Sequence, residues 1–182
     1  MSDEIIIDNP VIIDDKLSEP EKNATPEIKK DAVLFVCSGN TCRSPMCAAL
    51  FNHKYAGLTR HAISAGLSTG GEKISSSAVY ALKKYGVKST VDNDYENHVS
   101  RTVTAEMIDS AVTVIGVSSA HALSLIMRYP QYATKITSFD TDIFDPYGMD
   151  DEVYAYCLKK IDDALGKMFS SKEENENDGK DM

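Results

Sequence analysis

The chain has 182 residues, of which 42% are hydrophobic, and this length suits one domain with a buried core. No apolar run reaches the roughly 18 residues that a membrane-spanning helix needs, and the acidic start after Met1 is unlike a secretory signal. The 4 cysteines are too few for a disulfide framework, which favours a reducing, cytoplasmic location without membrane attachment.

Most of the formal net charge of −9 lies in the two ends, because residues 1–31 hold nine acidic and four basic residues and residues 170–182 hold five and two. We interpret 1–31 as an acidic, mostly disordered extension, 32–169 as the folded domain and 170–182 as an acidic disordered tail. The short apolar runs at 5–7 and 11–13 are compatible with an added edge strand or with a partner-binding segment. The sequence contains no basic patch of the kind that would predict a nucleic-acid partner.

A strand, a tight loop and a helix start follow one another at the beginning of the domain. The apolar run over 32–36 predicts a strand buried on both faces. Ser44 is a suitable cap for the next helix, and Pro45 fits its first turn. Between them the backbone must curl, which Gly39 permits through unusual φ/ψ values and Asn40 through its tolerance of the left-handed conformation.

The loop has the composition of a phosphate cradle. Its successive N–H groups and the positive end of the following helix together favour an anion. Arg43 adds a charged fork that matches two phosphate oxygens, and the same field stabilises a Cys37 thiolate, to which Ser44 can donate a hydrogen bond. The alternative, a purely structural Cys37, is disfavoured by the whole pattern. The predicted phosphate-binding residues are Ser38, Gly39, Asn40, Thr41, Cys42 and Ser44.

Residues 36–45, Val-Cys-Ser-Gly-Asn-Thr-Cys-Arg-Ser-Pro, resemble the signature loop of the low-molecular-weight protein tyrosine phosphatases, a family that includes the bacterial protein arginine phosphatases. The resemblance runs from about Ala32 to Phe169. It implies an α/β fold, a small flavodoxin-like three-layer α/β/α sandwich with a four-stranded parallel sheet, and a cysteine-dependent phosphatase acting on phosphorylated protein side chains. Ala48 stands where many relatives carry glutamate, which puts some support around the loop in doubt but not the nucleophile.

Helices and strands alternate along the rest of the domain, which predicts a parallel sheet covered on both faces. Helices are predicted over 46–55, 76–85, 104–110, 118–128 and 151–169, and strands over 61–66, 111–116 and, at a sheet edge, 135–139. The residues of the last helix that we expect to face inward are Val153, Tyr156, Cys157, Ile161 and Leu165. Ligands bind such sheets outside the carboxyl ends of the strands, where Cys37 falls.

Asp145 follows the last predicted strand and precedes Pro146. The family places its general acid in an Asp-Pro pair at this point, followed by an aromatic residue, so the resemblance implies Asp145 as the acid and Tyr147 as a wall beside the substrate. Proline restricts Asp145 to extended conformations, and burial or the phosphate's own charge would keep its carboxyl group protonated. Asp140 and Asp142 are rivals, but neither precedes proline.

The predicted reaction is a two-step displacement. Cys37 attacks phosphorus while Arg43 holds the oxygens, Asp145 protonates the leaving group, and water activated by Asp145 then hydrolyses the phosphocysteine. No metal or other cofactor is needed, and no His/Cys cluster has metal-ligand spacing. A non-catalytic phosphate-binding module is disfavoured because nucleophile, arginine and acid occur together, and arsenate reductase because the relay cysteines of those related enzymes are missing.

The resemblance implies a phosphorylated protein side chain as the substrate, and Thr41 indicates which kind of side chain it is. Arginine phosphatases of the family carry threonine at this position, whereas tyrosine-directed members usually carry a bulkier aliphatic residue. Phosphoarginine is therefore favoured over phosphotyrosine, although Tyr147 fits either substrate.

Two residues leave alternatives open. For His98 the alternatives are a contact with the phosphate, a pair with a carboxylate and a surface position without a role. Cys42 either forms the reversible disulfide with Cys37 that the family suggests or packs beneath the loop. The sequence leaves the oligomeric state, the physiological target and the role of residues 1–31 undetermined.

Overall fold

The computed structural model describes residues 32–55 and 61–169. Residues 1–31, 56–60 and 170–182 lie outside these ranges, so the predicted extension and tail remain predictions. Within the described ranges, helices and strands follow the order expected from the sequence.

Four parallel strands of the described chain form one sheet in the order β2-β1-β3-β4. They are β1 (Ala32–Cys37), β2 (His61–Gly66), β3 (Ala111–Gly116) and β4 (Ile136–Ser138). Every residue of the central strand β1 is buried, as a continuous apolar run predicts for a strand covered on both faces. β4 lies at the edge, as predicted, and is shorter than expected.

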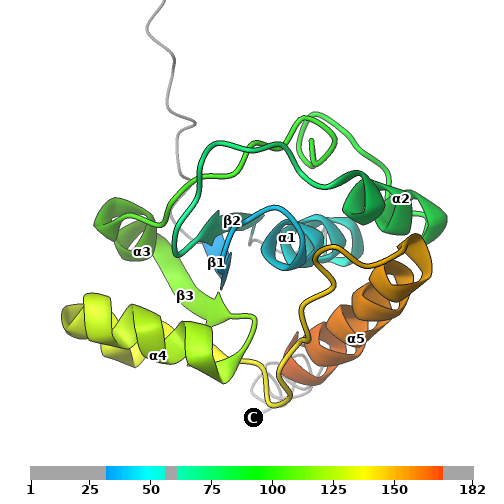
Figure 1. Cartoon of the computed structure of the whole chain (residues 1–182). Helices are drawn as coiled ribbons and strands as arrows, with labels where there is room; N and C mark the ends of the chain where they lie inside the picture. The colour runs from blue at the N-terminus through cyan, green and yellow to red at the C-terminus, as the bar shows by residue number, and fades with distance from the viewer. Residues whose placement is uncertain (1–31, 56–60, 170–182) are drawn as a thin grey trace, which may run out of the picture.

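Helices cover both faces of this sheet (Figure 1), which confirms the predicted three-layer α/β architecture. The helices are α1 (Arg43–Lys54), α2 (Ser76–Lys84), α3 (Ala105–Ser110), α4 (Ser119–Arg128) and α5 (Asp151–Phe169), with the 3₁₀ helix η1 (Pro130–Lys135) before β4. α1 packs on one face with α5 beside it and α2 against α5, whereas α3 and α4 pack on the other face.

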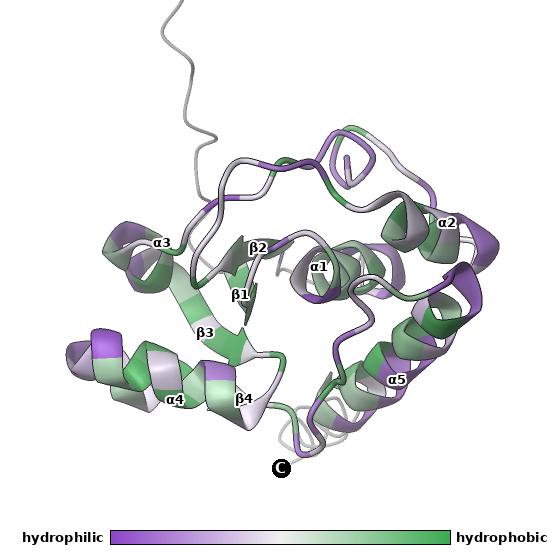
Figure 2. Ribbon diagram, in the orientation of Figure 1, coloured by the Kyte–Doolittle hydropathy of each residue, from purple (hydrophilic) through white to green (hydrophobic). Residues whose placement is uncertain are grey.

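Alternate side chains of β1 belong to two different cores. Val33, Phe35 and Cys37 lie in the core shared with α1 and α5, whereas Leu34 and Val36 lie in the core shared with α3 and α4. Figure 2 shows the strands as largely hydrophobic and the helices as mixed, with hydrophilic residues outside. Strand periodicity therefore places Cys37 on the α1 side of the sheet, at the carboxyl end of its strand.

Two helices begin one residue later than predicted because the first predicted residue is the cap. Thr104 and Ser118 have extended backbones, and their hydroxyl groups accept hydrogen bonds from the backbone N–H groups of Met107 and His121. The prediction that Ser44 caps α1 is wrong. α1 begins at Arg43, and its cap residue makes no side-chain cap bond, which leaves the first amide groups available for an anion.

The inward face of α5 differs from the prediction at two residues, because Val153 is only half-buried and Tyr156 is exposed. Tyr156 is 54% exposed, whereas Tyr154 is 2% exposed. Tyr154 precedes Cys157 by three residues and Leu158 by four, so helical spacing puts all three on the buried face. Tyr156 lies two residues after Tyr154, outside this spacing, and its ring packs at a tilt against that of Phe144.

The order of the strands reverses between β1 and β3, and this is the switch point where α/β sheets bind ligands. Gly66, at the end of β2, lies tightly against the loop that leaves β1 at this point. A Cβ atom added to Gly66 would lie 2.7 Å from the carbonyl oxygen of Ser38 and 3.1 Å from the Cβ atom of Asn40. The loop is therefore able to approach β2 only because this residue has no side chain.

The substitution Gly66→Ala should lower the free energy of unfolding by about 1–3 kcal/mol, because the added methyl group overpacks backbone atoms that have little freedom to move. Urea unfolding measures this loss. Gly166→Ala is the matched control: it lies in α5 with nothing within 4 Å of the added Cβ, so it should stabilise the helix by up to about 1 kcal/mol. Unchanged stability of Gly66→Ala would contradict the close approach.

Candidate active site

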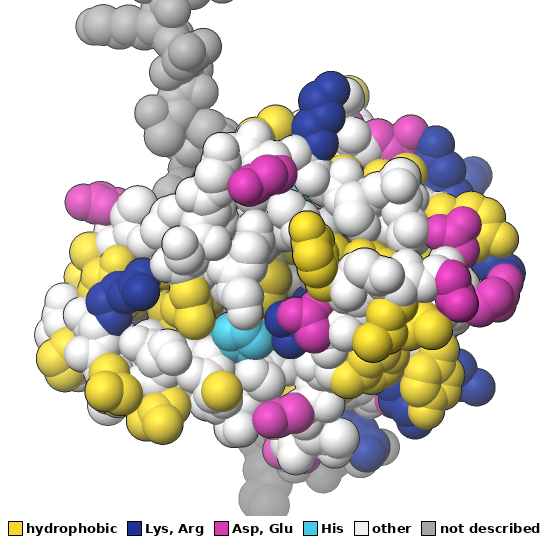
Figure 3. Space-filling view, in the orientation of Figure 1, with side chains coloured by type: hydrophobic (Ala, Val, Ile, Leu, Met, Phe, Trp, Pro, Cys, Tyr) yellow, Lys and Arg dark blue, Asp and Glu magenta, His cyan; other side chains and the backbone are white. Residues whose placement is uncertain are grey.

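The loop between β1 and α1 lines a hollow of about 480 Å³ together with two other segments of the chain. The segment before α5 contributes Asp145 and Tyr147, and residues 68–75 contribute the opposite wall. Figure 3 shows acidic, basic and histidine side chains meeting near the centre of one face of the molecule. The structure thus brings together all the site residues that the sequence predicted: Cys37, Ser38, Gly39, Asn40, Thr41, Cys42, Arg43, Asp145 and Tyr147 line the hollow, and Ser44 lies directly behind it.

The loop carbonyl groups point away from the hollow. Four of them accept hydrogen bonds from surrounding segments: Cys37 O from Leu67 N at 2.9 Å, Ser38 O from Ser68 N at 3.1 Å, Thr41 O from Ser75 N at 2.9 Å and Asn40 O from His98 Nε2 at 3.0 Å. Because carbonyl groups that bond outward leave the amide groups to face inward, this bracing favours an anion at the centre of the loop.

The sharp bend of the loop falls on Asn40 rather than Gly39. Asn40 has φ of 56° and is the one non-glycine residue with positive φ among the described residues. Gly39 is absent from the glycines with positive φ there, and a Cβ atom added to it would meet nothing nearer than Thr41 Oγ1 at 3.9 Å. The predicted role of Asn40 is confirmed, whereas the unusual φ expected of Gly39 is not found.

The buried Asn40 side chain joins the loop to two neighbouring segments. Its Nδ2 atom donates to Ser44 Oγ at 2.9 Å and to Ser64 Oγ of β2 at 3.0 Å. Its Oδ1 atom accepts from the backbone N–H of Arg101 at 3.0 Å. The amide thereby satisfies three polar partners in a place where water cannot replace it.

His98 supports the loop from behind and does not face the hollow. Its Nε2 atom donates to the carbonyl oxygen of Asn40, and burial, assisted by the charge of Arg101, lowers the pKa of the ring. His98 is therefore a neutral brace for the bend. This differs from each of the three alternatives that the sequence left open.

The Cys37 sulfur is buried at the floor of the hollow. It accepts the backbone N–H of Asn40 at 3.2 Å and lies 3.0 Å from Ser44 Oγ. The Ser44 hydroxyl group also lies 3.1 Å from the carbonyl oxygen of Ala65, so sulfur and carbonyl compete for one hydroxyl proton. A thiolate, being charged, is the stronger acceptor of the two.

The other cysteines have different surroundings. Burial raises the pKa of Cys157 to about 12 and raises that of Cys47 well above its usual value, so both are unreactive thiols at neutral pH. Cys42 Sγ lies 3.1 Å from the hydroxyl group of Tyr154, a residue that the sequence did not single out. Burial and this contact raise the pKa of Tyr154 to about 12.

Arg43 connects the loop to the segment that carries the predicted acid. Its Nη2 atom lies 2.5 Å from Asp145 Oδ2, and its Nη1 atom donates to the carbonyl oxygen of Ile143 at 3.3 Å. The second carboxylate oxygen of Asp145 accepts the backbone N–H of Tyr147 at 3.2 Å. The Asp145 side chain is 50% exposed, so the burial expected from the sequence is not found.

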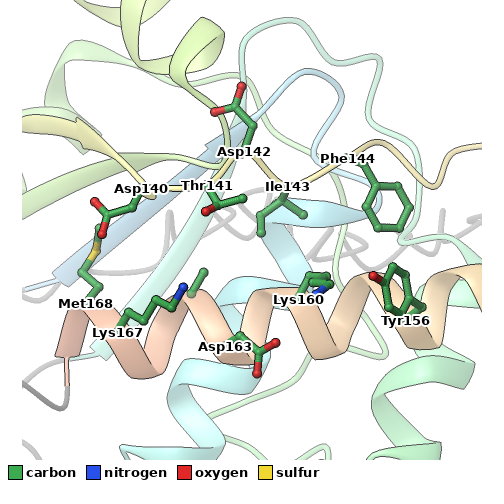
Figure 4. A pocket seen from close by; sticks show the side chains of 11 residues that line it. Asp140, Thr141, Asp142, Ile143, Phe144, Tyr156, Lys160, Asp163, Lys167 and Met168 are labelled. Carbon is green, nitrogen blue, oxygen red and sulfur yellow. The ribbon is translucent and has the colours of Figure 1, made fainter.

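The rival carboxylates lie elsewhere. Asp142 accepts hydrogen bonds from the backbone N–H of Ser119 at 2.7 Å and from its hydroxyl group at 3.0 Å, at the start of α4. Asp140 and Asp142 line a separate hollow of about 340 Å³ between the segment 140–144 and α5, where Ile143 points towards the helix and Asp142 away from it (Figure 4). Of the three carboxylates, Asp145 is the one that shares a hollow with Cys37.

His121 of α4 is the second residue that sequence reasoning missed. Its Nδ1 atom lies 2.6 Å from the hydroxyl oxygen of Ser118, and its Nε2 atom lies 3.0 Å from that of Ser38. Burial, followed by the charge of Arg43, lowers the pKa of His121, although Asp145 opposes the shift. The available signal was the serine cap three residues before it, which places the ring at the first turn of a helix beside the carboxyl end of β3.

No helix within residues 32–55 and 61–169 is long and apolar enough to cross a membrane. The same residues hold no group of three or more His, Cys, Asp or Glu side chains arranged for a metal ion.

Residues 32–178 match the family model for low molecular weight phosphotyrosine protein phosphatase. The match spans most of the chain and agrees with the flavodoxin-like sheet and with a loop that joins cysteine and arginine around one hollow. The chain therefore belongs to this family, and the identification made from residues 36–45 is confirmed.

Among its relatives, the protein-arginine-phosphatase of Geobacillus stearothermophilus is 30% identical over 143 residues, which cover 75% of this chain and 92% of the relative. The solved structure of that arginine phosphatase matches with a TM-score of 0.72 over 84% of this chain and 99% of its own. A low molecular weight protein tyrosine phosphatase from T. tengcongensis is 36% identical, with a TM-score of 0.70 over 78% of this chain and 99% of its own. An arsenate reductase of Halalkalibacterium halodurans is 27% identical over 140 residues, or 77% of this chain and 93% of the relative.

Two substitutions of Asn40 separate its side-chain bonds from its backbone conformation. Asn40→Gly should lower the free energy of unfolding by about 2–3 kcal/mol, because buried groups lose their partners. Asn40→Ala should cost about 1 kcal/mol more, because alanine disfavours positive φ. Urea unfolding of both variants measures the difference. Equal stability of the two would refute the backbone argument, and a loss in neither would refute the side-chain argument.

Proposed function

We propose that this cysteine-dependent protein phosphatase removes the phosphoryl group from phosphoarginine side chains of proteins. The observation that carries the proposal is the convergence of the Cys37 sulfur, the Arg43 guanidinium group and the Asp145 carboxylate on one hollow. These groups supply a nucleophile, a phosphate clamp and an acid, which are what a phosphatase needs when no metal takes part.

In the first step the Cys37 thiolate attacks phosphorus. A sulfur–phosphorus bond forms, the bond from phosphorus to the substrate nitrogen breaks, and Asp145 gives its proton to that nitrogen. The inward amide groups and the Arg43 guanidinium group hold the phosphoryl oxygens. An incoming phosphoryl group competes with Asp145 for Arg43, and its negative charge favours the protonated carboxyl group that the step requires.

In the second step water attacks the phosphocysteine. Asp145, now a carboxylate, takes the proton of the water, the sulfur–phosphorus bond breaks, and inorganic phosphate leaves. The Cys37 thiolate is thereby restored, and it is stabilised by hydrogen bonds from the N–H of Asn40 and the hydroxyl group of Ser44. The Ser44 hydroxyl group that contacts the Ala65 carbonyl oxygen thus has the sulfur as a second acceptor.

Thr41 supports phosphoarginine as the substrate. The residue is half-buried on the wall of the hollow, where its hydroxyl group suits the N–H groups of a guanidinium better than a phenyl ring. Tyr147 is 74% exposed at the rim and suits a flat group of either kind. The arginine phosphatase among the relatives agrees with this choice, although tyrosine-directed enzymes are relatives as well.

Arsenate reduction is disfavoured, even though one relative bears that name. Burial raises the pKa of both Cys47 and Cys157, which leaves no activated thiol for a relay beyond the loop within the described residues. We further propose that the protein works in the reducing cytoplasm, because its 4 cysteines are too few for a disulfide framework.

The substitution Cys37→Ser should abolish turnover of an aryl phosphate, and Asp145→Asn should slow it by roughly 10²–10⁴-fold, the range expected for loss of a general acid. A stopped-flow burst of leaving group from the wild type separates an enzyme from a phosphate-binding module. Full turnover by Cys37→Ser would disprove the mechanism.

Rates on phosphoarginine and phosphotyrosine peptides test the choice of substrate. We expect the wild type to prefer phosphoarginine and Thr41→Ile to shift the ratio of kcat/KM values towards phosphotyrosine by about tenfold, because a neutral hydrogen bond is lost and an apolar wall gained. A wild-type preference for phosphotyrosine would refute the assignment.

A reversible disulfide between Cys37 and Cys42 is proposed as protection against oxidation. Peroxide converts the Cys37 thiolate to a sulfenic acid, and the Cys42 thiol displaces water from it to form the disulfide. Peroxide-treated wild type should therefore recover activity with a thiol reductant, and Cys42→Ser should recover much less. Equal recovery by the two would contradict the disulfide and leave Cys42 a structural role through its contacts with Tyr154 and Thr41.

A further inference from the structure

The Ser38 side chain occupies a special place in the hollow. It is the exposed residue directly after the nucleophile, yet its hydroxyl oxygen is fixed by His121 Nε2 at 3.0 Å. His121 is itself 7% exposed and is held from the other side by Ser118. An exposed serine normally rotates freely, so a buried histidine that orients one is a feature that the two-step mechanism does not use.

The hydrogen-bond count leaves Ser38 able to accept a bond from the substrate. A serine hydroxyl group has one proton and two lone pairs. The bond to His121 uses the proton if the ring nitrogen accepts, and one lone pair if it donates. At least one lone pair remains for either tautomer of the ring, so the conclusion does not depend on which nitrogen carries the proton.

Ser38 and Asp145 line the same hollow. Ser38 is bonded there to His121, and Asp145 is bonded to Arg43. Asp145 must lie beside the leaving group in order to protonate it. Ser38, directly after the Cys37 nucleophile, therefore shares with Asp145 the hollow that the phosphorylated group enters.

We propose that Ser38, oriented by His121, is a specificity-determining residue that accepts a hydrogen bond from the phosphorylated guanidinium group. This rests on the proposed function. A guanidinium carries several N–H donors that lose water on entering the hollow, and each needs an acceptor. The hydroxyl groups of Ser38 and Thr41 and the carboxylate of Asp145 supply acceptors on the wall, whereas a phenyl ring gains nothing from them.

In this scheme His121 is a positioning residue that acts through Ser38. Its neutral ring, bonded at both nitrogens, holds the Ser38 oxygen towards the substrate instead of allowing it to turn to solvent. Loss of His121 should then matter only while Ser38 is present. A ring that merely packed under α4 would matter equally with or without the serine.

The test is a double-mutant cycle in which the measured quantity is the ratio of the kcat/KM values for two substrates. kcat/KM is measured on a phosphoarginine peptide and on p-nitrophenyl phosphate for the wild type, Ser38→Ala, His121→Asn and the double variant. The first two substitutions should each lower the phosphoarginine-to-aryl ratio, by about tenfold for Ser38→Ala. The double variant should fall no further than Ser38→Ala alone, and His121→Gln, whose amide reaches the Nε2 position, should recover most of the ratio.

Three outcomes overturn the proposal: a Ser38→Ala ratio within twofold of the wild type, an equal effect of His121→Asn in the alanine background, or equal losses on both substrates. His53→Ala, an exposed histidine in α1, is the matched control and should not change the ratio. Thermal unfolding checks that each variant folds. If His121→Asn does not fold, the substrate ratio of Ser38→Ala by itself tests the role of Ser38. Failure of the proposed function shows in the wild type itself, as absent turnover of phosphoarginine.

Discussion

The left-handed bend at Asn40 is the constraint on which the site depends. The bend directs the Asn40 N–H towards the Cys37 sulfur, while the buried side-chain amide ties the loop to Ser44, Ser64 and the Arg101 backbone. One residue thus sets the direction of the backbone and anchors it to a helix, a strand and a distant loop. Its conformation is costly for a residue with a side chain, and the three buried bonds offset that cost.

Around this bend the fold supplies rigid support from several directions. Loop carbonyl groups accept hydrogen bonds from the segments after β2 and from His98, so the amide groups of the loop are directed towards the hollow. Gly66 lets β2 approach the loop closely enough for these bonds to form. Sheet topology provides the space for the ligand, because the switch in strand order between β1 and β3 leaves an open crevice at the carboxyl end of β1.

Much of this was predictable from the sequence because the informative signals are local. A continuous apolar run predicts a buried strand, and a short loop with cysteine, asparagine and arginine predicts an anion site. The resemblance to the family singled out Asp145 among three nearby carboxylates, through the proline that follows it. The bounds of β2, β3 and α5 were predicted as the structure has them.

The parts that were missed depend on contacts between distant segments. His121 and Tyr154 reach the loop from helices 83 and 112 residues further along the chain than their partners, and no local pattern reports such a meeting. Ser44 looked like a cap because the sequence does not show that its hydroxyl group contacts the Cys37 sulfur and accepts a hydrogen bond from the buried Asn40 amide. The sequence left burial or the phosphate's charge as the means of keeping Asp145 protonated, and the 50% exposed side chain paired with Arg43 does not fit the first of these.

The proposed mechanism requires that the phosphoryl group passes through a covalent bond to Cys37 during turnover. The wild-type protein is mixed with a phosphoarginine peptide, quenched within milliseconds and analysed by mass spectrometry for a covalent phosphoryl group. Our account predicts one phosphoryl group on Cys37, formed before free phosphate appears. Phosphate release with an unmodified Cys37, or a phosphoryl group on any other residue, would contradict it.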